Sequence, residues 1–205
     1  MSSLTPNKNA SQNNAKIESG TLICPIWLFI NPKYPSVLRK IWTPVLFEIQ
    51  EKVYRDLHKS IDISEIYTRY VVKDKKLVPN TLNWWDNEVI KEMEYIRGLI
   101  SEYRPKLLIS FGSFPFEYLR RVCKITPKKG PKYWSNKNIS DEFIMAIENF
   151  DISKTNLIPL LRNVNFNGKF IEDIGNNKEN YFHIFGTKIA EKLIENKDSL
   201  NIWIS

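Results

Sequence analysis

Four short apolar runs alternate along the chain with longer amphipathic stretches, and this alternation limits the folds open to it. The runs are rich in aliphatic and aromatic residues and are bounded by turn or charged residues, as buried strands are. They are TLICPIWLFI (21–30), EIYTRYVV (65–72), KLLISFG (106–112) and TNLIPLL (155–161). Helical spacing of apolar residues predicts helices over 45–57, 87–103, 114–122 and 181–194. This order of elements predicts an α/β fold, a three-layer α/β/α sandwich around a mainly parallel four-stranded sheet.

The length of 205 residues and the 42% hydrophobic content fit one domain with a substantial core. Residues 1–20 are polar, rich in Asn and Ser and without periodicity, so we expect a flexible N-terminal tail followed by a single domain over 21–205. The longest apolar run, 22–30, is interrupted by Pro25 and is too short to span a bilayer. We therefore expect a cytoplasmic, monomeric protein that does not bind membranes.

The scarcity of cysteine and histidine argues against metal and cofactor chemistry. Cys24 and Cys123 lie far apart in apolar runs without a CxxC spacing, which favours buried reduced thiols over a zinc site or a disulfide. The two histidines, His58 and His183, are too few for a histidine metal site, and they leave little material for a Ser-His-Asp triad. We expect no metal and no cofactor.

The first strand end carries the strongest candidate for chemistry, because ligands of parallel sheets bind at the carboxyl ends of the strands. Asn31 follows the first run, and Pro32 and Pro35 stiffen the loop that presents it. An asparagine can orient a water molecule, since its carbonyl accepts and its amide donates, but it cannot deprotonate that water. The alternative is an ordinary Asn-Pro turn.

The other strand ends carry further polar, cationic and aromatic residues. Arg69 and Tyr70 end the second run, and Gly112 and Ser113 follow the third, where a helix start offers N–H groups to an anion and glycine permits close approach. The segment after the fourth run mixes cations, amides and aromatics, as expected of a loop that touches phosphates and enters a base stack. Its candidate residues are Arg162, Asn163, Phe166 and Lys169. The net charge of +7 points in the same direction, toward a polyanionic partner.

Four segments in this order resemble the uracil-DNA glycosylase superfamily. FINPKY (29–34) is similar to the first loop of the family, which has the form GxDPY or GINP, and TPVLFEIQEKV (43–53) to its proline-containing turn and helix. The strand 65–72 would present the base-reading residue, followed by the Gly-ended strand 107–112. LIPLLRNVNF (157–166) stands where the family has its LPxxHPSP loop. The likeness covers about residues 21–194.

The sequence departs from the family at several positions. Phe29 replaces the leading glycine of the first motif, and Arg162 replaces the histidine of the last loop. Asn163-Val164 follows in place of Pro-Ser, and Arg69 or Tyr70 replaces the base-reading asparagine. These replacements predict that the pocket prefers a base other than uracil, either a larger or a modified one.

The resemblance implies a monofunctional DNA glycosylase that flips a base out of single- or double-stranded DNA and hydrolyses its N-glycosidic bond to leave an abasic site. Asn31 would hold the water, and Arg162 would stabilise the departing base or clamp a phosphate. The other expected roles are stacking on the base by Tyr34 or Phe47, filling of the vacated stack by Phe166, and DNA contacts by Lys33, Asn163 and Lys169. A modified base suggests defence against phage with modified DNA, and repair of deaminated bases is the alternative.

Three other functions stay open at this stage. Lys33 beside the anomeric carbon could form a Schiff base and cut the strand. The missing histidine and aspartate are also compatible with an inactive DNA-binding or inhibitor protein on the same fold. An enzyme that acts on free nucleosides, such as a deoxyribosyl transferase, would need paired carboxylates at the strand ends, and the sequence places none there.

Overall fold

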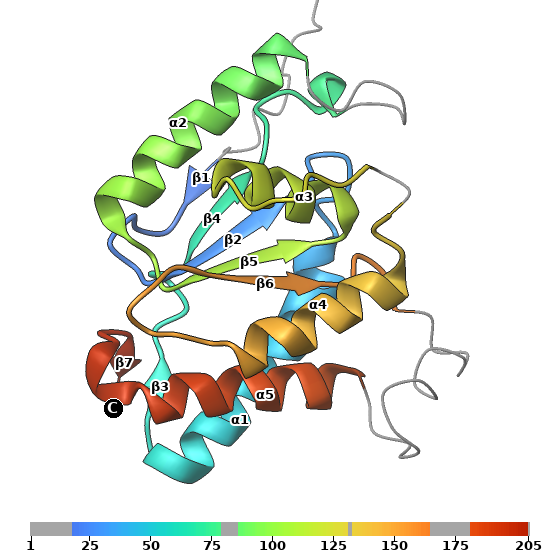
Figure 1. Cartoon of the computed structure of the whole chain (residues 1–205). Helices are drawn as coiled ribbons and strands as arrows, with labels where there is room; N and C mark the ends of the chain where they lie inside the picture. The colour runs from blue at the N-terminus through green and yellow to red at the C-terminus, as the bar shows by residue number, and fades with distance from the viewer. Residues whose placement is uncertain (1–17, 79–85, 131–132, 165–180, 205) are drawn as a thin grey trace, which may run out of the picture.

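The computed structural model describes residues 18–78, 86–130, 133–164 and 181–204, which form a sheet with helices on both faces (Figure 1). The sheet has five strands in the order β1-β4-β2-β5-β6. Its parallel strands are β2 (Ile26–Ile30), β4 (Tyr67–Tyr70), β5 (Leu107–Phe111) and β6 (Asn156–Leu160). Each lies inside one of the four predicted runs.

The fifth strand, β1 (Glu18–Ser19), pairs antiparallel with β4 and lies inside the range 1–20, for which we expected no secondary structure. The sheet therefore has one strand more than the four that the sequence predicts. Gly20 follows β1 with φ of +78°, and a Cβ there would lie 2.1 Å from the Ile66 carbonyl oxygen, so glycine is required. Residues 1–17 lie outside the described part of the chain.

The helices divide between the two faces of the sheet. On one face lie α1 (Thr43–Leu57), α4 (Asn136–Glu148) and α5 (Tyr181–Glu195). On the other face lie α2 (Asn87–Tyr103) and α3 (Ser113–Val122). Shorter elements are the π-helix η1 (Leu38–Trp42), the 3-10 helices η2 (Lys75–Leu77) and η4 (Lys197–Ser199), and a separate pair of strands, β3 (Ser60–Ile61) and β7 (Trp203–Ile204). This arrangement confirms the predicted α/β class and its layers.

Local sequence signals explain where two of the helices begin. The Asp86 side chain accepts a hydrogen bond of 2.9 Å from the Val89 N–H, which caps α2. Ser135 caps α4 in the same way through the Asn138 N–H at 3.2 Å. α4 was not among the predicted helices.

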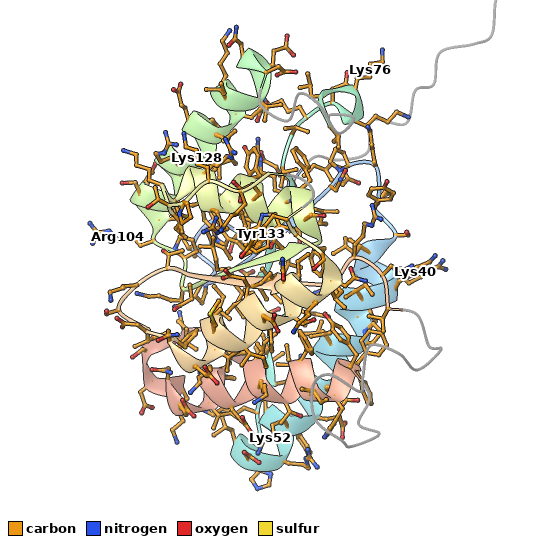
Figure 2. The ribbon with its side chains drawn as sticks, turned by 45° about the vertical axis from the view of Figure 1, so that its right-hand side comes forward. Lys40, Lys52, Lys76, Arg104, Lys128 and Tyr133 are labelled. Carbon is orange, nitrogen blue, oxygen red and sulfur yellow. The ribbon has the colours of Figure 1, made fainter. Side chains whose placement is uncertain are left out.

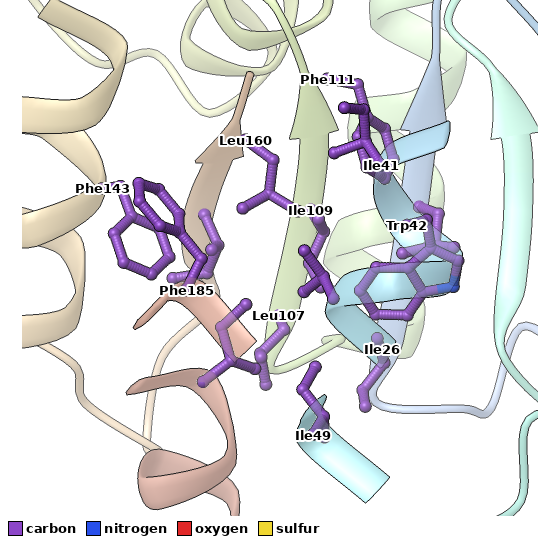
Figure 3. Packing of buried hydrophobic residues seen from close by; sticks show 14 of the residues in the cluster. Ile26, Ile41, Trp42, Ile49, Leu107, Ile109, Phe111, Phe143, Leu160 and Phe185 are labelled. Atoms are coloured by element: carbon purple, nitrogen blue, oxygen red, sulfur yellow. The ribbon is translucent and has the colours of Figure 1, made fainter. Parts of the chain in front are cut away.

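The larger part of the core lies between the sheet and the face formed by α1, α4 and α5 (Figure 3). All five residues of β2 are buried, because helices cover both faces of this central strand. Phe143 of α4 and Phe185 of α5 stack at 4.0 Å between ring centroids. Burial of each such side chain contributes about 2 kcal/mol to folding.

The connections between the parallel strands locate the site. From the carboxyl end of β2 the chain leads to β4 on one side. From the carboxyl end of the neighbouring strand β5 it leads to β6 on the other side. Connections that depart in opposite directions leave a crevice between the carboxyl ends of the two strands, and ligands of open α/β sheets bind in such crevices. Here this position lies between the ends of β2 and β5, where Asn31 and Gly112 follow, and we call it the crevice.

Candidate active site at the carboxyl ends of the strands

Asn31 is only 6% exposed, and its own loop fixes its side chain. Its Oδ1 accepts a hydrogen bond of 2.9 Å from the Lys33 N–H, and its backbone oxygen accepts one of 2.9 Å from the Tyr34 N–H. Among the residues that the structure describes, no acceptor bonds its Nδ2. The amide donor and the second lone pair of Oδ1 are thus available to a water molecule or a ligand.

Lys33 links the loop that follows β2 to the segment that follows β4. Its Nζ donates a hydrogen bond of 2.6 Å to the backbone oxygen of Val78, in the segment that follows β4. An ammonium held in this way stabilises the loop around Asn31. Attack by Lys33 on an anomeric carbon would first require this bond to break, so the geometry does not favour the Schiff-base alternative.

Arg162 connects the ends of β2, β5 and β6. Its guanidinium lies 4.1 Å from the ring centroid of Tyr34, which is a cation–π contact. Gly112, with φ of +83°, lies against the same side chain, because a Cβ there would be 2.9 Å from Arg162 Cβ. Three candidates from distant parts of the chain therefore meet at the crevice.

A side chain of α5 hydrogen-bonds the backbone of the residue that precedes Arg162. The Leu161 N–H donates a hydrogen bond of 2.9 Å to Tyr181 Oη. Burial raises the pKa of Tyr181, which keeps this hydroxyl neutral. The start of α5 thereby fixes the end of β6 and the residue that carries the guanidinium.

The remaining candidates lie around this group or outside the described residues. Ser113 begins α3, and Asn163 is exposed beside Arg162. Tyr70 is half-buried and packs against the core under α1. Phe47 is 61% exposed on the second turn of α1, where it is free of the core. Phe166 and Lys169 fall in the range 165–180, which the structure does not describe.

Arg69 was expected in the base pocket, but its side chain is fully buried beneath α2. One guanidinium nitrogen pairs with Glu18 of β1, and the other lies 2.8 Å from Glu92 of α2. Strand alternation explains this position, since Arg69 and Tyr70 point to opposite faces and only the face of Arg69 meets α2. A guanidinium that is enclosed between two carboxylates is not accessible to a base, so we leave Arg69 out of the site.

The edge around the site is strongly basic. The segments that follow β2, β4 and β6, namely 31–42, 71–78 and 161–164, contain seven basic residues and one acidic residue. The basic residues are Lys33, Arg39, Lys40, Lys73, Lys75, Lys76 and Arg162. The single acid, Asp74, caps η2 by accepting from the Lys76 N–H at 2.8 Å. The described residues of these segments therefore contain no pair of carboxylates that could act on a free nucleoside.

Other features of the described residues bear on cofactors and membranes. No group of three or more His, Cys, Asp or Glu side chains there could hold a metal ion. Both cysteines are free thiols, and burial raises the pKa of Cys123 to about 11. No helix in this part of the chain has the length and apolar character needed to cross a bilayer.

Comparisons of the sequence with protein-family models and with curated proteins give no match. Function is therefore inferred from the motifs of the sequence and from the geometry of the crevice. Two cavities of the described surface lie away from that crevice, one beside Leu57 and Trp203 and the other beside Phe116 and Asn156.

Proposed function

We propose that the protein is a monofunctional DNA glycosylase, which hydrolyses the N-glycosidic bond of a base flipped out of DNA. The observation that carries the proposal is Asn31, a nearly buried asparagine at the crevice with its amide donor unused among the described residues. The FINPKY segment around it resembles the first loop of the uracil-DNA glycosylase superfamily, which supports a catalytic role for Asn31. The basic edge around it suits a phosphate backbone.

In the proposed reaction the Asn31 side chain holds a water molecule against the anomeric carbon. The bond from that carbon to the base breaks, and its electron pair leaves with the base. The sugar becomes oxocarbenium-like, the water oxygen bonds to the anomeric carbon, and one water proton passes to solvent or to the departed base. A positioned water is sufficient for such a cation, so no strong general base is required.

Arg162 would stabilise the departing base, which gains negative charge as the bond breaks. Fixed charge aimed at a developing anion can supply several kcal/mol of transition-state stabilisation. The contact with Tyr34 and the close approach to Gly112 hold the guanidinium in place before the reaction. The half-exposed ring of Tyr34 would also be available to stack on the flipped base.

The substrate class follows from the charges and from the departures in sequence. A free nucleoside has no backbone for the basic edge to bind, whereas DNA does. The residues that replace family positions, Arg162 and Tyr70 among them, favour a base that differs from uracil. We propose a modified base of phage DNA as the target, with deaminated bases as the second candidate.

The proposal is tested by incubating the protein with oligonucleotides that contain uracil, hypoxanthine, hydroxymethylcytosine or glucosylated hydroxymethylcytosine, and with phage genomic DNA. Excision is scored as alkali-labile sites. We expect abasic sites with at least one modified substrate, and none with the Asn31→Ala variant at equal concentration. Binding of DNA without abasic sites on any substrate would instead favour the inactive DNA-binding protein.

A further inference from the structure

The buried carboxylate of Glu117 organises a loop outside the crevice. Glu117 lies in α3 and is fully buried. Its oxygens accept hydrogen bonds from Arg121 Nε at 2.9 Å, the Lys129 N–H at 2.9 Å and Trp134 Nε1 at 3.0 Å, and Arg120 Nη1 lies at 3.3 Å. A buried carboxylate is costly unless it is paired and hydrogen-bonded. Its partners therefore fix the described part, 123–130 and 133–135, of the segment between α3 and α4, here called the basic loop.

The two arginines that pair with Glu117 also hold the backbone of the basic loop. Arg120 Nη1 donates to the Pro127 oxygen at 3.0 Å, and Arg121 Nη2 donates to the Lys129 oxygen at 3.3 Å. The Ile125 N–H bonds the Arg120 oxygen at 2.8 Å. The described part of the loop lacks regular secondary structure, yet its backbone is anchored at several points.

The outer surface of the basic loop is cationic. Residues 123–135 include four lysines and no acidic residue. Lys124 and Lys128 are exposed, and Lys129 Nζ lies 4.1 Å from the ring centroid of Tyr133, which is 43% exposed (Figure 2). The anionic group thus lies inside and the cations lie outside. An anchored backbone suits a loop that binds a polyanion, because less conformational entropy is lost on binding.

The loop runs from the amino edge of the sheet to its carboxyl edge. It begins at the end of α3 and runs back along this helix to the start of α4 (Figure 1). α4 leads into the amino end of β6, so its own start, next to Tyr133, lies toward the carboxyl edge of the sheet. Lys124 therefore lies toward the amino edge, next to Ile125, which lines a cavity with Asn156, whereas Tyr133 lies toward the carboxyl edge. The loop thus spans the α3 face between the two edges.

We propose that the basic loop binds the phosphate backbone of DNA beside the excised base, with Glu117 as its positioning residue. This inference rests on the proposed DNA substrate. Lysines would neutralise phosphates, and the Tyr133 ring would pack on a sugar or an unpaired base. An acidic membrane surface fits less well, because Ile125 is the one exposed aliphatic residue among the described part of the loop.

The test compares two triple variants that remove equal charge. One carries Lys124→Ala, Lys128→Ala and Lys129→Ala, and the control carries Lys59→Ala, Lys154→Ala and Lys197→Ala, which are exposed lysines outside the loop. DNA affinity is measured over a salt series, and excision is measured in single turnover at saturating protein. We expect the loop variant to bind about tenfold more weakly, with a salt slope smaller by roughly 0.9 for each lost phosphate contact, and to excise at the normal rate once bound.

Equal affinities of the loop variant and the control would overturn the inference and leave the proposed function intact. If the wild-type protein binds no DNA, the proposed function fails and the inference fails with it. Loop-dependent binding to vesicles of anionic lipid, without an effect on DNA, would also overturn it.

The positioning role of Glu117 is tested by a double-mutant cycle for DNA affinity. Glu117→Gln should weaken binding in the wild-type background and have little effect in the loop-variant background, because the loop mediates its effect. Equal effects in both backgrounds would overturn the positioning role. If Glu117→Gln does not fold, Trp134→Phe removes one anchoring donor and serves in its place.

Discussion

The two edges of the sheet differ in charge. Among the described residues, the segments after β2, β4 and β6 (31–42, 71–78 and 161–164) carry seven basic residues and one acidic residue, whereas the segments that lead into β4, β5 and β6 (58–66, 104–106 and 149–155) carry four basic and three acidic residues. The sheet itself does not require a basic carboxyl edge, so the difference points to a partner of negative charge at that edge.

The two edges also differ in how they use asparagine. Asn156, at the amino edge, donates through Nδ2 to the backbone oxygens of Lys106 at 3.1 Å and Asp151 at 2.9 Å, and its Oδ1 accepts from the Asp151 N–H at 3.0 Å. Hydrogen bonds from Ser153 and Lys154 lower the pKa of Asp151 to about 2. At the amino edge polar groups bond to one another. At the carboxyl edge Asn31 keeps a donor unused among the described residues, as a site for water requires.

The largest effect is expected just inside the carboxyl edge, at Arg69. Arg69→Asn would leave Glu92 and Glu18 without their buried cation, at a cost of about 3 kcal/mol in the free energy of unfolding. We expect a lower melting temperature and an unchanged ranking of excised bases. The companion variant is Tyr70→Asn, because Tyr70 is the remaining candidate of β4 for contact with the base. In this variant we expect the ranking of excised bases to change at a constant melting temperature. A changed ranking with Arg69→Asn at constant melting temperature would return Arg69 to the site.

The two asparagines provide a direct contrast between the edges. Asn31→Ala should lower the single-turnover excision rate by about a hundredfold, the scale of losing one catalytic contact, with little change in melting temperature. Asn156→Ala should lower the melting temperature, because it removes several backbone contacts, and should leave the rate of the folded protein unchanged. An unchanged rate in Asn31→Ala would remove Asn31 from the mechanism.

Two glycines give a smaller contrast, measured by urea unfolding. Gly112→Ala should cost about 1–3 kcal/mol, because φ is positive and the new Cβ would press on Arg162. Gly98→Ala, in α2, should instead stabilise the protein by about 0.5–1 kcal/mol, since a Cβ there meets nothing within 4 Å. A gain of stability at Gly112 would contradict the close approach between Gly112 and Arg162.

The sequence predicts the parallel strands well because their signal is local. Each of the four runs is apolar over its own length, and 87–103 matches α2 at both ends. β1 could not be predicted from two polar residues that are ordered only by pairing with β4. The sequence of α4 does carry a local helix signal. Ser135 caps the helix, and the apolar residues Ile139, Phe143 and Ile147 recur every fourth residue.

The site was harder to predict because its contacts are long-range. Arg162, after β6, and Tyr34, after β2, meet only because β6 and β2 both pair with β5, an order that the runs do not specify. Alternation correctly places Arg69 and Tyr70 on opposite faces, but it does not reveal which face carries Glu92. The partners of a buried charge depend on how the helices pack, and local patterns do not contain that information.

The central claim, that DNA binds at the carboxyl edge, is tested most directly by the salt dependence of DNA affinity in two variants. One variant carries Arg39→Ala, Lys40→Ala and Arg162→Ala, and the other carries Lys59→Ala, Arg104→Ala and Lys154→Ala at the amino edge. We predict that the slope of log affinity against log salt falls by roughly 0.9 per lost contact in the first variant and stays at the wild-type value in the second. An equal change in both variants, or a larger change in the second, would contradict the account.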